Sequence, residues 1–114
     1  MRDERERLLD ILEAIEQIER YINQGKETFK NDELIQTWVI HHIQIIGEAS
    51  AKVSNVLRMT HTEIPWQKII AMRNILVHAY FSVDLEEVWF SVESDLPDLK
   101  CKVKAILQEL EGES

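Results

Sequence analysis

A chain of 114 residues, 45% apolar and 30% charged, suits one globular domain and excludes a disordered or collagen-like chain. Three Gly and two Pro are too few for the turns of a many-stranded β protein, and the single Cys excludes an intramolecular disulfide. The net charge of −8 disfavours a nucleic-acid partner at first sight, and no apolar run reaches the ~18 residues of a membrane span. We expect one cytoplasmic domain, residues 1–114.

The spacing of apolar residues predicts helices in the first half of the chain. In residues 3–23 they recur at intervals of three and four, which makes one helical stripe, and Gly25 then ends the helix. A second helix is expected over residues 32–57 or 32–59. Its apolar surface is unusually wide, which indicates burial on two sides, the second by another subunit.

Three more helices are expected in the second half. Pro65 suits the first turn of a helix over residues 65–79 or 65–80, because its missing N–H costs little there. Asp84 begins a fourth helix, which Pro97 interrupts, and a last helix covers residues 96–110. The fold class predicted is all-α, an up-and-down bundle of four or five helices.

The charges are unevenly distributed along the chain. Residues 1–33 hold ten acids and residues 84–114 hold nine, whereas residues 34–83 hold two acids against four bases, together with all four His. Acidic outer helices around a neutral-to-basic centre suit a small anion site better than an extended nucleic-acid track. The alternative, that the acidic ends merely keep a small protein soluble, stays open.

The third predicted helix carries the candidate catalytic and binding side chains. At 100° per residue, Arg73, Asn74, His78 and Tyr80 share the face opposite the apolar one. An Arg can bind a phosphate bidentately, and a His can move a proton near neutral pH. Arg and His without metal ligands fit cleavage of RNA through its own 2′-hydroxyl. Taken singly, Arg73 could be a surface ion pair, His78 a helix C-terminal cation and Tyr80 a packing residue.

The segment Arg73-Asn74-Ile75-Leu76-Val77-His78-Ala79-Tyr80 has the order Arg, four residues, His, one residue, Tyr. It resembles the signature of the HepT-like toxins in the HEPN superfamily. Residues 65–70 before it and 81–84 after it match as well, and residues 10–15, 36–39 and 46–49 resemble the earlier helices of the family. The resemblance covers nearly the whole chain.

This resemblance implies a small HEPN-type bundle whose homodimer brings two Arg…His motifs into one composite cleft. It implies a metal-independent ribonuclease without a cofactor, the toxin of a type VII-like toxin–antitoxin pair, acting on a cellular RNA such as tRNA or mRNA. A minimal nucleotidyltransferase antitoxin would neutralise it by transferring AMP to Tyr80. Arg73 and His78 would be catalytic, with Asn74 supporting the motif, and no membrane would be involved.

Other residues of the second helix bear on this site. Glu48 is the only acid between residues 34 and 62, so it would either orient Arg73 or His78 or form a buried structural ion pair. Gly47 beside it would permit close approach of another helix. His41 and His42 are read as core or interface imidazoles, and His61 lies in a predicted loop with no convincing partner in the sequence. None of the three has an assigned role.

Two other functions remain possible. A non-catalytic subunit could dock a nucleotidyltransferase and present substrate or nucleotide to it, with the face around Tyr80 as an acceptor surface. A helical dimerisation module without any site is the third interpretation, and the grouping of Arg73, Asn74 and His78 argues against it. Dependence of RNA cleavage on Arg73 or His78 would distinguish a nuclease from a docking subunit.

Overall fold

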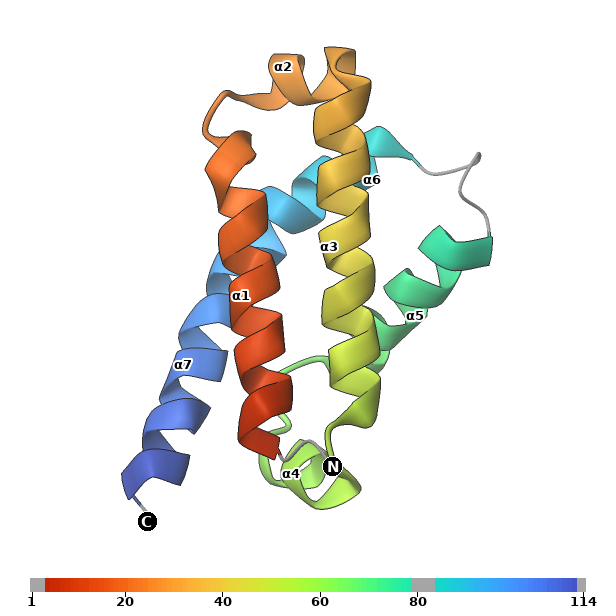
Figure 1. The fold of residues 1–114 in the computed structure, drawn as a ribbon. Coiled ribbons are helices and arrows are strands. Elements are labelled where there is room, and N and C mark those ends of the chain that lie inside the picture. Colours follow the sequence, from red (N-terminus) through yellow and green to blue (C-terminus); the bar gives the residue numbers. More distant parts are fainter. Residues whose placement is uncertain (1–3, 79–83, 113–114) are drawn as a thin grey trace.

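The computed structural model describes residues 4–78 and 84–112, and every regular element in these two segments is helical (Figure 1). This confirms the all-α fold class. Among these residues, no helix is both long enough and apolar enough to cross a membrane.

Two long helices, α1 (Glu4–Ile22) and α3 (Glu33–Lys52), lie side by side and run in opposite directions (Figure 1). The apolar stripe predicted for α1 is confirmed: Leu12 and Ile22 are partly buried, and its other members are fully buried, namely Leu8, Ile11, Ile15 and Ile18. Asp32 is the N-cap of α3: its carboxylate accepts hydrogen bonds from two backbone N–H groups in the first turn of the helix, at 2.9 and 3.3 Å. The pair forms the centre on which the other helices pack.

The predicted second helix is wrong at its C-terminal end, because α3 stops at Lys52. Val53 is extended, and Ser54 caps a separate short helix, α4 (Asn55–Thr60), through its Oγ atom. Glu4 stabilises this break from the start of α1: its carboxylate accepts hydrogen bonds from the N–H and the Oγ–H of Ser54, at 3.0 and 2.7 Å. A tertiary contact of this kind leaves no trace in local periodicity.

The second half of the chain follows the prediction, with one difference. Helix α5 (Trp66–His78) packs on α3, and α7 (Leu96–Gly112) packs on α1. Helix α6 (Leu85–Phe90) passes through a π-helical turn, Ser91–Asp95, directly into α7. Pro97 therefore does not interrupt the helix. Proline has no N–H to donate to the carbonyl group four residues earlier, and the π-helical turn lies at that point of the chain, just before Pro97.

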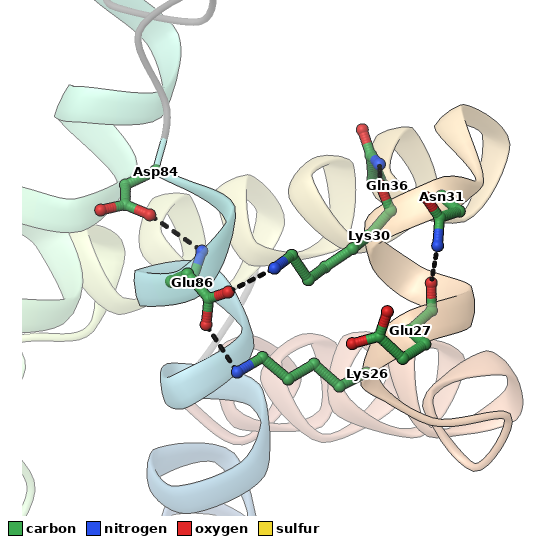
Figure 2. Close-up of polar contacts among 7 residues, drawn as sticks. All are labelled: Lys26, Glu27, Lys30, Asn31, Gln36, Asp84 and Glu86. Carbon is green, nitrogen blue, oxygen red and sulfur yellow. Dashed lines mark hydrogen bonds and ion pairs between the residues drawn. The ribbon is translucent and has the colours of Figure 1, made fainter.

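Helix α2 (Lys26–Asn31) lies in a stretch for which the sequence predicts no helix, and ionic contacts tie it to α6 (Figure 2). The ammonium groups of Lys26 and Lys30 each lie 2.6 Å from one oxygen of the Glu86 carboxylate. These two hydrogen bonds, Lys26 first, lower the pKa of Glu86 to about 2. Between the same two helices, the rings of Phe29 and Trp89 pack with centroids 5.4 Å apart. The contacts close one end of the bundle.

We expect the substitution Glu86→Gln to lower the thermal midpoint at neutral pH by a few degrees. Because the folded-state pKa of Glu86 lies below its ordinary value of 4.5, its stabilisation is present above that value. The stabilisation is lost as the pH falls from about 5 towards 2, so the difference between wild type and variant should shrink over this range. Thermal unfolding followed by circular dichroism at several pH values measures it.

Glu87→Gln is the matched control, since this neighbouring carboxylate is exposed and has no ion pair within the two described segments. Equal effects of the two substitutions would show that the α2–α6 contact contributes nothing specific.

Candidate functional site

Helix α5 approaches α3 most closely where Arg73 lies against Gly47. A Cβ atom added to Gly47 would stand 2.1 Å from Cβ and 2.7 Å from Cγ of Arg73, and 3.4 Å from the carbonyl oxygen of Ile69. No side chain other than hydrogen fits in that space. Gly47 therefore sets the position of Arg73 on the bundle, which confirms the predicted close approach.

The guanidinium of Arg73 is held only loosely. Its Nη1 donates to Oδ1 of Asn74 at 3.0 Å, and its Nη2 lies 3.4 Å from Oε1 of Glu48. Its Nε is buried and has no acceptor among the described residues. An Arg carries five N–H donors, so this one retains donors for a ligand such as a phosphate.

The structure corrects the placement of two of these residues. Arg73 does not lie wholly opposite the core, because the first carbons of its side chain pack on α3 and only 32% of the side chain is exposed. Glu48 is not part of a buried ion pair, since half of its side chain is exposed. It contacts Arg73, which agrees with the orienting alternative. Asn74 is exposed beside them.

The structure describes the backbone of His78 and does not describe Tyr80. His78 is the last residue of α5, five positions after Arg73, which is about 7.5 Å along the helix axis. Its side chain is not among those described. Tyr80 lies outside the described residues, so its assignment stays a prediction.

A groove of about 380 Å³ runs between α1 and α3 beside this site. Glu48 lines it and so connects it to Arg73, while Arg7, Lys52 and His42 line other parts of it. Sequence reasoning missed Arg7 and Lys52. The i, i+4 spacing of Glu48 and Lys52 places those two on one face of α3, but nothing local shows that Arg7 faces them from α1.

The three remaining His occupy different environments. His42 is 8% exposed and its Nδ1 lies 2.7 Å from the carbonyl oxygen of Trp38, whereas His41 is exposed on the same helix. His61 lies between two carboxylates, 3.1 Å from Glu63 and 3.5 Å from Glu109. The core interpretation is therefore confirmed for His42 and wrong for His41, for which a position in an interface stays a prediction.

Comparison with known proteins points to ribonucleases. Residues 11–106 match the family model described as Ribonuclease HepT-like. A protein of Thermococcus cleftensis named "Probable ribonuclease HepT" is 42% identical over 106 residues, which is 92% of this chain and 96% of that protein. A protein of Methanocaldococcus jannaschii named "Putative RNase MJ1380" is 34% identical over 106 residues, 92% of this chain and 97% of that protein. No solved structure gives a significant match.

The substitution Gly47→Ala should destabilise the fold although Ala is the better helix former. The added Cβ would overlap the Arg73 side chain, so α5 must move away from α3, and we expect a loss of about 1–3 kcal/mol in the free energy of unfolding. Urea unfolding measures this loss. Gly112→Ala is the control, because nothing lies within 4 Å of the Cβ it would add. Unchanged stability of Gly47→Ala would contradict the close approach.

Proposed function

Because the chain belongs to the HepT-like ribonuclease family, we propose that it is a metal-independent endoribonuclease and the toxin of a type VII-like toxin–antitoxin pair. Its substrate is a cellular RNA such as tRNA or mRNA. The observation that carries the proposal is the state of Arg73. The base of its side chain is held by the Gly47 contact, whereas its two Nη atoms make only the contacts to Asn74 and Glu48 and keep N–H donors for an anion.

The chemistry needs only the RNA and side chains that transfer protons and bind anions. A base takes the proton from a 2′-hydroxyl, whose oxygen then attacks the adjacent phosphorus. The bond from phosphorus to the 5′-oxygen breaks, and an acid protonates that oxygen as it leaves. In this proposal His78 transfers protons and Arg73 stabilises the negative charge on the crowded phosphorane, with Asn74 and Glu48 positioning Arg73.

Acid and base catalysis together require two proton-transfer groups, whereas each chain supplies one His of this motif. A symmetric homodimer would bring two Arg73…His78 pairs into one composite cleft. Helix α5 supports this arrangement, because its main packing partner in the described part of the chain is α3. Its other side is left for a second copy.

Control of the toxin would act on the same surface. We propose that a minimal nucleotidyltransferase antitoxin transfers AMP from a nucleoside triphosphate to the hydroxyl of Tyr80, with pyrophosphate leaving. Tyr80 follows His78 by two residues, so the added phosphate would compete with RNA for Arg73. The purine would block the surface sterically.

Wild-type protein should cleave RNA in the presence of EDTA, and His78→Ala and Arg73→Ala should each be slower by at least about 100-fold. That is the usual contribution of a general acid–base group and of a group that stabilises charge in the transition state. Single-turnover cleavage of labelled cellular RNA measures this. His41→Ala is the control, because that His is exposed on α3 and outside the motif.

If the wild type cleaves no RNA, the nuclease assignment fails, and the non-catalytic subunit that docks a nucleotidyltransferase becomes the better interpretation.

Tyr80→Phe should keep the ribonuclease activity but escape the antitoxin, because Phe has no hydroxyl to accept AMP. Growth of cells that express toxin and antitoxin together, with the mass of the purified toxin, measures both effects. The chain contains only two Tyr, so Tyr21→Phe is a matched control that should still be neutralised. Rescue of growth by the antitoxin in the Tyr80→Phe strain would rule out Tyr80 as the essential acceptor.

A further inference from the structure

We propose that the groove between α1 and α3 binds the nucleotides beside the bond that is cleaved. Arg7 and Lys52 hold the RNA backbone there, and His42 accepts a hydrogen bond from a base. The inference rests on RNA as the substrate of the proposed function. It adds a site on helices that carry no part of the Arg73…His78 motif.

The groove is continuous with the candidate catalytic residues. Glu48 lines the groove, and its Oε1 lies 3.4 Å from Nη2 of Arg73. Lys52 follows Glu48 by one helical turn, about 6 Å along the axis of α3. Helix α1 lies beside α3 along this length (Figure 1). An RNA strand with one phosphate at Arg73 therefore leads directly into the groove.

The two cations of the groove are available to phosphates. Several other cations of this acidic chain are tied to carboxylates, as in the pairs of Glu86 with Lys26 and Lys30. In the part of the chain that the structure describes, neither Arg7 nor Lys52 forms an ion pair, although carboxylates line the same groove. Cations of this kind, which face one groove from two helices, suit the backbone of a single strand.

His42 supplies an acceptor to the same groove. Its Nδ1 lies 2.7 Å from the carbonyl oxygen of Trp38, which can only accept, so Nδ1 carries the proton. Its Nε2 is then an acceptor, and the described residues offer it no donor. The residue is 8% exposed, and its ring centroid lies 4.5 Å from that of Trp38. An acceptor fixed in this way is satisfied by a donor that enters the groove.

The groove is polarised along its length. Asp10 and Glu13 line it from α1 and add acceptors, whereas the cations Arg7 and Lys52 come from the start of α1 and the end of α3. Phosphates are repelled from the carboxylates and held at the cationic end. Acceptors select N–H donors. Adenine, cytosine and guanine present two of them on an exocyclic amino group, whereas uracil has only its ring N3–H, so we expect a base with an amino group to be preferred near His42. Within the described segments, no three of the His, Cys, Asp and Glu residues are grouped so as to hold a metal ion.

Binding is tested separately from cleavage in the His78→Ala protein with single-stranded RNA oligonucleotides. The double substitution Arg7→Gln, Lys52→Gln should weaken binding about 25-fold at 0.1 M salt. Each phosphate contact to a single strand contributes ~0.7 to the slope of log K against log salt concentration, so the loss of two contacts makes this slope shallower by about 1.4. The matched control is Arg5→Gln, Lys104→Gln, with the same change in charge. Arg5 contacts Glu111 on α7, and Lys104 is exposed on α7, so both lie away from the groove.

His42→Phe tests the base contact. It keeps a ring against Trp38 but removes the acceptor, so the preference for oligo(A) and oligo(C) over oligo(U) should disappear. Thermal unfolding of the variant shows whether it is folded, and the Arg7/Lys52 variant tests the groove independently if it is not.

Three outcomes would overturn the proposal. In the first, the groove and control variants bind RNA equally. In the second, the Arg7/Lys52 variant binds like its parent. In the third, that variant changes the oligomeric state at unchanged RNA affinity, which would make the groove a contact between copies. If the wild type cleaves RNA and the groove variants bind RNA normally, only the proposed role of the groove is refuted. If RNA binding depends on the groove but the wild type does not cleave RNA, only the proposed nuclease function is refuted.

Discussion

The contact between Gly47 and Arg73 is the constraint on which the arrangement of the candidate site depends. It brings α5 so close to α3 that the first carbons of the Arg73 side chain occupy the place of a missing Cβ. The long side chain is thereby ordered at its base and left loose at its tip, where Glu48 and Asn74 make incomplete contacts. A catalytic cation needs this combination, because a fixed origin lowers the entropy lost on binding an anion while free donors remain to bind it.

The acidic character of the chain also looks different in the structure. Several acids are engaged with specific cations across helix pairs: Glu86 with α2, Glu19 with Lys100 of α7, and Glu111 with Arg5 of α1. These contacts hold outer helices together and neutralise the cations there. Arg7 and Lys52 stay outside such pairs within the described chain and share a groove next to Arg73. A net charge of −8 is thus compatible with a local anion site, because the field at a site depends on nearby charges and on their exposure.

The sequence predicts most of the fold, because most of it follows from local periodicity. The stripe of α1 and the start of α3 at Asp32 are readable from apolar spacing and capping chemistry, and so is α5 after Pro65. The end of α3 is not readable, since Glu4 stabilises the break at Ser54 from the far side of the bundle. For the site, the sequence indicates Arg73, Glu48 and Gly47, but the face calculated for Arg73 fails because a neighbour without a side chain lets it turn inward. Arg7 and the open side of His42 need the pairing of α1 with α3, which no single helix encodes.

The closed end of the bundle has a consequence for the order in which the protein can form during synthesis. Helix α2 has only six residues, too few to be stable alone, and its buried Phe29 packs against Trp89, sixty residues later in the chain. Gln36 of α3 can already hold the carbonyl groups of Phe29 and Lys30, so the N-terminal half can position the end of α2. The aromatic pair itself must wait until residue 89 has left the ribosome. A nascent chain stalled before that point would expose the Phe29 ring to solvent or to chaperones, while α1 and α3 could already pair.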